Sequence, residues 1–121
     1  LLDRGCVTGG WNYGNSNMFG AELHPYVPTT AIAVLALQDR ANDAAAQRGA
    51  QFLAAQATWE RSSYAISLAR IALDVISGSG GSLDASLGEQ VSTTCDMGNQ
   101  FGAAQALYAL RNYDNHAAFR L

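Results

Sequence analysis

The chain has 121 residues, enough for one domain with its own core but not for two. Hydrophobic residues make up 49% of it and charged residues only 14%, against about 25% in a typical globular chain. The net charge is −3 and the seven basic residues are scattered singly. Phosphate binding needs clustered basic side chains, so nucleic acid is excluded as an expected partner. No apolar run approaches the roughly 18 residues of a transmembrane helix.

A surface so poor in charge indicates that part of it is covered by other protein. The chain also opens at Leu1, without a methionine. We therefore expect a single repeat domain, residues 1–121, that is a segment of a larger protein. The two cysteines, Cys6 and Cys95, do not decide the cellular compartment, and whether they pair is left open.

Residues 1–18 are rich in Gly, Asn, Thr and Ser, which favour turns over regular structure. We expect a loop there, held in place by Trp11 and Tyr13. No stretch of the chain alternates apolar and polar residues for long enough to predict a strand.

Residues 31–37 are apolar on every side, and a helix without a polar face must be enclosed by other helices. Pro28 marks its start, and Thr29 or Thr30 is the expected N-cap. A turn at residues 38–40 ends it.

The second predicted helix runs from Ala44 to about Ala57, with Asn42 or Asp43 as its cap. Apolar and small residues recur on one face, and polar residues lie across from them, which indicates an outer helix exposed on one side. The buried face holds Ala45, Gly49, Phe52, Leu53 and Ala57, and the opposite face holds Gln47, Arg48 and Gln51.

A third helix is predicted over residues 64–76, capped by Ser62 or Ser63. The remaining predictions are a flexible break (77–82), a short helix (83–90), a loop (91–98), an apolar helix (99–111) ending at Asn112, and half a helix in the tail (113–121). Buried and half-exposed helices thus alternate, with Trp- and Gly-bearing turns between them. The expected fold is all-α, built from stacked helical hairpins.

Several segments together resemble the repeats of the squalene and hopene cyclases and of the prenyltransferases. They are Gly9-Gly10-Trp11, Pro25-Tyr26-Val27-Pro28-Thr29-Thr30-Ala31, Leu35-Ala36-Leu37-Gln38, and Arg48-Gly49 with Phe52-Leu53 and Gln56. The resemblance covers roughly Gly9 to Trp59. It implies an α/α toroid, in which inner helices form a barrel around an apolar cavity and outer helices surround them. A chain of this length would form an arc of that ring, and an uncovered inner face would favour self-association.

The catalytic motifs of these families are missing. Pro28 stands where the cyclases have the acid that protonates an alkene or epoxide, and proline has no proton to give. The zinc ligands of the protein prenyltransferases have no counterpart, because Cys95 and Asp96 are adjacent and in the wrong order. Leu87 replaces the cysteine of the related thioester proteins in Ser86-Leu87-Gly88-Glu89-Gln90. The sequence predicts no catalytic residue, metal site or cofactor in this chain.

Some residues remain candidates for binding, each with a structural alternative. His24 is either an acid, base or metal ligand beside Glu22, or a surface loop residue. Cys95, Asp96 and His116 form a zinc site only if the fold gathers them, since their spacing matches no known zinc pattern.

Ser67, Arg70, Asp74 and Ser77 form a polar ridge on the third helix. The ridge either binds the polar head of a ligand or is a solvated edge on which Arg70 and Asp74 make a weak surface pair.

Aromatic residues offer a wall for an isoprenoid chain or a cation, or they serve the fold. The set is Trp11, Tyr13, Phe19, Tyr26 and Trp59. In the cyclase and prenyltransferase families, the tryptophan of each repeat packs one helical hairpin against the next. The resemblance implies the same structural role for Trp11 and Trp59.

Two functions follow. The first is a non-catalytic helical module that binds an apolar, isoprenoid-like ligand or a protein partner. A second copy of the chain is one such partner, which would give a homo-oligomer. The second is a segment of a terpenoid cyclase or prenyltransferase whose catalytic residues lie elsewhere. The residues expected to bind a ligand are His24, Tyr26, Trp11, Arg70 and Asp74.

Overall fold

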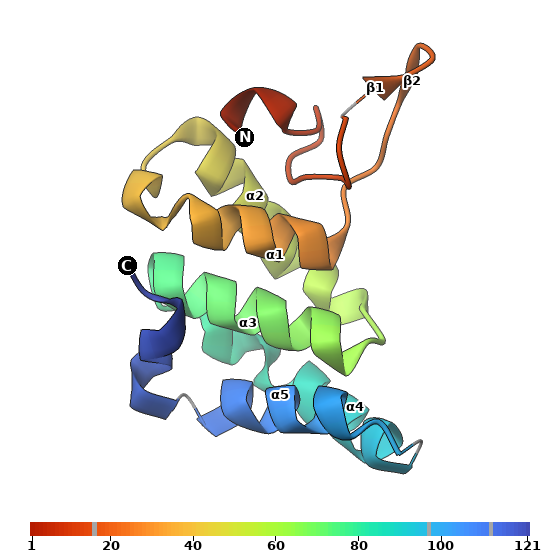
Figure 1. The fold of residues 1–121 in the computed structure, drawn as a ribbon, viewed down its shortest axis with the longest axis vertical. Helices are drawn as coiled ribbons and strands as arrows, with labels where there is room; N and C mark the ends of the chain where they lie inside the picture. Colours follow the sequence, from red (N-terminus) through yellow and green to blue (C-terminus); the bar gives the residue numbers. More distant parts are fainter. Residues whose placement is uncertain (16, 97, 112) are drawn as a thin grey trace.

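The computed structural model describes residues 1–15, 17–96, 98–111 and 113–121, and most of these are helical (Figure 1). The α-helices are α1 (Val27–Ala36), α2 (Ala44–Gln56), α3 (Ser63–Ser77), α4 (Asp84–Asp96) and α5 (Gln100–Arg111). Short 3₁₀ helices are η1 (Leu2–Arg4), η2 (Gln38–Arg40), η3 (Ala57–Trp59), η4 (Gly80–Leu83) and η5 (Tyr113–Phe119). The predicted all-α class is confirmed.

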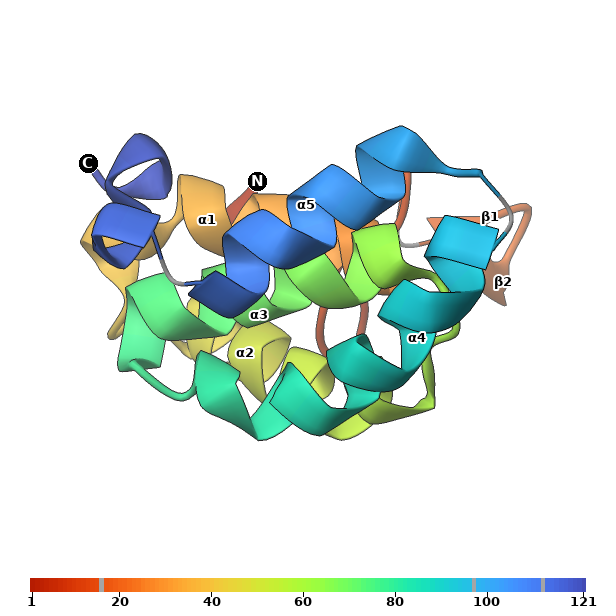
Figure 2. The same ribbon diagram turned by 90° about the horizontal axis from the view of Figure 1, so that it is seen from below.

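The helices form two layers (Figures 1 and 2). In one layer α1, α3 and α5 lie side by side and run in the same direction, while α2 and α4 lie behind them. The central helix α3 contacts each of the other four, and every residue from Ala65 to Leu73 is buried. None of the helices that the structure describes is long and apolar enough to cross a membrane.

The first helix begins at Val27, earlier than predicted, and its cap differs from the prediction. Tyr26 occupies the N-cap position without a side-chain hydrogen bond. The expected caps bond to the preceding loop instead: the Thr29 hydroxyl donates to the carbonyl of Trp11 (2.8 Å), and the N–H of Trp11 donates to the Thr30 hydroxyl (2.9 Å). These contacts attach the N-terminal loop to α1.

Trp11 holds the loop in place as predicted, because it is only 3% exposed and belongs to the core. Its indole Nε1 donates to the carbonyl of Leu1 (2.9 Å), and its ring lies against Gly49 of α2. The predicted anchoring by Tyr13 is wrong, since that side chain is 75% exposed. The structural role expected of Trp59 is also wrong, because it is 82% exposed.

Two predicted caps are confirmed. The Asp43 carboxylate accepts from the N–H of Ala45 at the start of α2 (3.4 Å), and the Ser62 hydroxyl accepts from the N–H of Ala65 at the start of α3 (3.3 Å). α1 ends at Leu37, without a glycine, whereas α3 ends at Gly78. The φ of 66° at Gly78 is a left-handed conformation that glycine adopts without strain. The predicted faces of α2 are also confirmed, with Gly49 buried on one side.

The structure corrects the prediction of a short helix and a loop over residues 83–98. α4 continues unbroken to Asp96. Val91 packs against the core, and the Thr94 hydroxyl donates to the Ser63 hydroxyl of α3 (2.8 Å). The polar, β-branched sequence has a weak helix propensity of its own, and these contacts with the rest of the fold outweigh it.

A small hairpin precedes α1 and was not predicted. Its strands β1 (Asn17–Met18) and β2 (Ala21–Glu22) pair antiparallel. Phe19 and Gly20 between them have φ values of 52° and 80°, which suits a tight two-residue turn. Two-residue strands are too short to produce an alternating sequence pattern.

The C-terminal tail returns to α1. Most of it forms η5, where half a helix was expected, while Asn112, the predicted end of the preceding helix, lies outside the described residues. The side-chain amide of Gln38 donates to the carbonyl of Phe119 (2.9 Å), and its oxygen accepts from the N–H of Leu121 (2.8 Å). The tail therefore lies beside the C-terminal end of α1 (Figure 2).

Candidate functional site

The five residues expected to bind a ligand lie in three separate places. His24 and Tyr26 line a pocket where α1 begins, and Trp11 lines a groove along α1. Arg70 and Asp74 belong to a polar network in the C-terminal half of α3. The structure brings His24 and Tyr26 together but does not gather all five into one site.

The aromatic pocket is a cavity of about 490 Å³ where α1 begins and α2 ends. Two of its aromatic residues, Tyr26 and Trp59, are exposed, and Phe52 is half-buried. The ring of Tyr13 lies 5.4 Å from that of Tyr26, centre to centre. The lining residues are Thr8, His24, Pro25, Tyr26, Val27, Phe52, Gln56, Trp59 and Glu60.

Backbone contacts fix both sides of the aromatic pocket. One oxygen of Glu60 accepts from the N–H groups of Arg61 (2.9 Å) and Ser62 (3.2 Å), so its carboxylate is held at the start of α3. On the other side, the side-chain amide of Asn12 donates to the carbonyl of His24 (2.6 Å). His24 is thus carried by an anchored segment and lines the cavity.

The α1 groove has a volume of about 440 Å³. Its floor is formed by the exposed Ile32 and Ala36 of α1, with the buried Ala33 between them, beside Trp11. Arg4 is the single charged side chain among its described lining residues, and Nη1 of this arginine donates to the side chain of Asn15 (2.7 Å). The remaining lining residues are Leu1, Asn12, Gly14 and Thr29.

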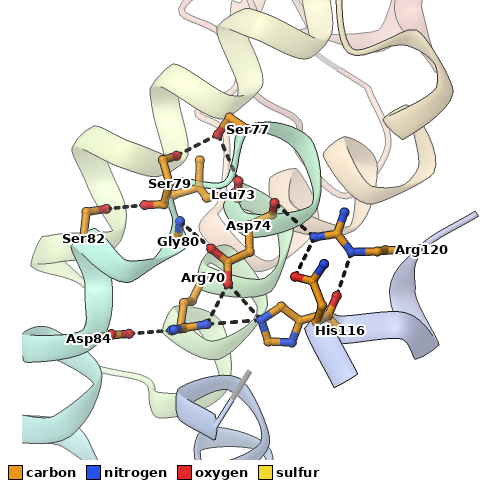
Figure 3. A network of polar contacts seen from close by, with 11 residues as sticks. Arg70, Leu73, Asp74, Ser77, Ser79, Gly80, Ser82, Asp84, His116 and Arg120 are labelled. Carbon is orange, nitrogen blue, oxygen red and sulfur yellow. Dashed lines mark hydrogen bonds and ion pairs between the residues drawn. The ribbon is translucent and has the colours of Figure 1, made fainter. Parts of the chain in front are cut away.

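The third place is a buried polar network (Figure 3). Arg70 is only 5% exposed and contacts two carboxylates, Asp74 through Nη1 (2.9 Å) and Asp84 through Nε. The other oxygen of Asp74 accepts from the N–H of Gly80 (2.9 Å). The network therefore joins α3 to η4 and to the start of α4.

His116 of the tail completes the network. It is fully buried, with Nε2 at 3.0 Å from Oδ2 of Asp74 and 3.1 Å from Nη1 of Arg70. Burial lowers the pKa of His116 below 6.5, and the charges of Arg70 and Arg120 lower it further, although the Asp74 carboxylate opposes them. A neutral ring with its hydrogen on Nε2 can donate to Asp74. Nδ1 has no hydrogen-bond partner among the described residues.

The network corrects the prediction of a solvated ridge with a weak surface pair. Ser67 is fully buried and its hydroxyl donates to the carbonyl of Ser63. The side chains of Arg70 and Asp74 are 6% and 13% exposed beneath α4 and the tail, and of the four ridge residues Ser77 is the exposed one. The partners Asp84 and His116 lie 14 and 46 residues from Arg70, and no sequence spacing indicated them.

No zinc site is formed by Cys95, Asp96 and His116. Cys95 and Asp96 are exposed while His116 is buried, and the described residues contain no group of three or more His, Cys, Asp or Glu that could hold a metal ion. Cys6 and Cys95 are both free thiols. Burial raises the pKa of Cys6, and the negative charge of Glu22 raises it further. A hydrogen bond from the backbone of Asn12 acts in the opposite direction and lowers this pKa.

The two exposed cavities and the buried network have different chemical uses. The network is buried around Arg70 and His116, with Asp84 at its solvent edge, and it joins α3, η4, α4 and the tail, so its groups serve stability. The aromatic pocket and the α1 groove are open and combine apolar walls with polar groups, as binding sites do, and the groove is the more apolar of the two. Comparisons with protein-family models, with curated proteins and with solved structures found no match.

Proposed function

We propose that the chain is an arc of an α/α toroid of the prenyltransferase and squalene-hopene cyclase kind, and that it binds an apolar, isoprenoid-like ligand without transforming it. The observation that carries this proposal is the apolar floor of the α1 groove. Ile32 and Ala36 are exposed to an open groove of about 440 Å³ beside Trp11. An apolar surface of this kind is favourable to cover.

The arrangement of helices supports the arc. α1, α3 and α5 run in the same direction in one layer, with α2 and α4 behind them (Figure 1). Inner and outer helices alternate in the same way along a toroid, and α1 with its groove belongs to the inner layer in that comparison. The resemblance of the repeat segments to the cyclases and prenyltransferases points in the same direction.

The composition of the groove supports binding rather than catalysis. Its described lining residues include no carboxylic acid, imidazole or thiol. Proline occupies position 28, where the cyclases have their acid. Arg4 gives the groove one positive charge, so a ligand with an apolar chain and a negatively charged head matches it best.

The test is calorimetric titration of the chain with farnesyl diphosphate and farnesol. We expect saturable binding, and Ile32→Glu should weaken it by about tenfold or more, because a carboxylate on the apolar floor is costly to desolvate. Met18→Glu is the matched control. Met18 is 52% exposed, against 54% for Ile32, and it lines neither the groove nor the aromatic pocket.

Absence of saturable binding, or an equal loss in both variants, would contradict the proposal. Conversion of farnesyl diphosphate into a new product would indicate the alternative function, a segment of a terpenoid cyclase or prenyltransferase. Product analysis by mass spectrometry after incubation distinguishes the two functions.

A protein contact is supported by a different observation at the edge of the layer. On α5, Phe101 is 70% exposed and Leu107 is 54% exposed. A groove beside them is walled by Phe101, Tyr108 and Phe119 and has almost no polar surface. We propose that a second copy of the chain covers this edge. Light scattering should show a dimer or larger assembly that Phe101→Glu dissociates, and a monomeric parent chain would exclude the contact.

A further inference from the structure

We propose that the aromatic pocket binds a small organic cation carrying a trimethylammonium group. This site is separate from the α1 groove, and no residue lines both cavities. The inference rests on the side chains that line the pocket and on the way they are fixed, so it does not depend on the proposed function.

The first argument is the aromatic wall. Tyr26, Phe52 and Trp59 line one cavity, and Tyr13 lies against Tyr26 at its margin. Trp59 is 82% exposed, so its ring makes little contribution to the core and is available to a ligand. Aromatic faces attract cations through their quadrupole, tryptophan most strongly, and aromatic cages recognise quaternary ammonium groups in this way.

The second argument is the charge of the pocket. Glu60 is the one carboxylate among the described lining residues, and no arginine lines the cavity. The chain contains no lysine. A carboxylate beside aromatic rings repels an anion and gives no benefit to a neutral apolar ligand, but it attracts a cation over several ångströms. The aromatic pocket therefore differs from the α1 groove in the sign of its charge, because the groove is lined by Arg4 and the pocket by Glu60.

The third argument is that Trp59 and Glu60 lie on a fixed stretch of backbone, and that the carboxylate of Glu60 is held before any ligand binds. They end a tight turn in which the N–H of Glu60 donates to the carbonyl of Ala57 (3.3 Å). One oxygen of Glu60 accepts two backbone N–H groups, so the carboxylate does not have to be ordered when a ligand binds. A site that is ordered in advance loses less entropy on binding.

The experiment is a titration with choline, followed by the indole N–H signals in ¹H–¹⁵N NMR spectra. Trp59 and the buried Trp11 are the two tryptophans, so two indole signals report on the pocket and on the core separately. We expect the Trp59 signal to shift in a saturable manner while the Trp11 signal stays in place. The neutral isostere 3,3-dimethylbutan-1-ol should bind about tenfold more weakly, because it lacks only the charge.

Two variants test the roles of individual side chains. Glu60→Gln keeps an oxygen for the two backbone N–H groups and removes the charge, and it should weaken choline binding about fivefold or more. Glu89→Gln, on the exposed side of α4, is the matched control and should have no effect. Trp59→Leu should abolish measurable choline binding, and the variant should fold because Trp59 is exposed. Since this variant lacks the reporting indole, its choline binding is measured by calorimetry.

Three results would overturn the inference. Equal affinity for choline and 3,3-dimethylbutan-1-ol would show that the pocket selects apolar shape alone. Unchanged binding in Trp59→Leu would place the cation elsewhere, and an absence of saturation up to high millimolar choline would show that there is no site. Ile32→Glu should leave choline binding unchanged, so failure of farnesyl binding in the α1 groove is distinguishable from failure here.

Discussion

The ring of Trp11 lies directly on Gly49, so closely that a Cβ at position 49 would come to 2.6 Å from the ring carbon Cζ3. The side chain of Val34 comes within 2.9 Å of the same Cβ position. The loop before α1, α1 itself and α2 therefore meet at one residue that has no side chain.

Replacing Gly49 by alanine should lower the free energy of unfolding by about 1–3 kcal/mol, because neither the indole nor the valine can move aside without repacking. Urea unfolding followed by far-UV circular dichroism measures the change. Gly88→Ala in α4 is the control: nothing lies within 4 Å of its Cβ position, so it should stabilise the helix by about 0.5–1 kcal/mol. Equal effects of the two variants would contradict the close contact.

Arg70→Leu should destabilise the fold by about 3 kcal/mol or more. The change leaves the carboxylate of Asp74 buried without its positive partner, and breaking a buried ion pair from one side is costly. Arg61→Leu, at an exposed position, should change the stability by less than about 0.5 kcal/mol. A loss below about 1 kcal/mol in Arg70→Leu would show that the network is not a stabilising element.

Stability should fall as the pH decreases below about 6.5, the ordinary pKa of histidine. The fold holds His116 neutral because burial lowers its pKa, whereas the unfolded chain takes up a proton in this range. The unfolded state then binds more protons, so the contribution of His116 is complete above about pH 6.5 and is lost as the pH falls toward the lowered pKa. His116→Asn should unfold with a smaller pH dependence between about pH 7 and 5.5, and an unchanged slope would exclude His116 as the cause.

The two thiols should react at very different rates. Cys95 is exposed, whereas Cys6 is only 4% exposed and burial raises its pKa, so less thiolate is present at neutral pH. Iodoacetamide should label Cys95 in the native protein and reach Cys6 only after denaturation, as followed by peptide mass spectrometry. A disulfide between Cys6 and Cys95 in the unreduced protein would contradict the structure.

The helices with strong local signals were predictable from the sequence. Asp43 and Ser62 bond to the N–H groups that their positions implied, and the period of small and apolar residues in α2 placed Gly49 on the buried face. Such features depend on residues three or four positions apart, and the sequence displays those spacings directly.

Features that depend on distant contacts were not predictable. The second half of α4 is helical because Thr94 meets Ser63 and Val91 meets the core, while its local sequence favours a loop. The burial of Arg70 depends in the same way on His116, which lies 46 residues away.

Of the candidate sites, His24 and Tyr26 were expected to bind a ligand, and they lie in one pocket. No spacing or motif indicated that Glu60 would join them, because the turn that carries Glu60 follows a different helix. The resemblance to the repeat tryptophan predicts a structural role for Trp59. Its exposure in a pocket follows only from the observed position of η3.

The two hydrogen bonds that Gln38 makes with the tail have a consequence for the order of folding. They join the end of α1 to Phe119 and Leu121, across 81 and 83 residues of chain. Closing a loop of that length costs more entropy than forming a hairpin, so the contact forms only once α1, α3 and α5 already lie together. We therefore expect the tail to be the last part of the molecule to gain protection against amide exchange during refolding, and the first to lose it when the fold opens locally.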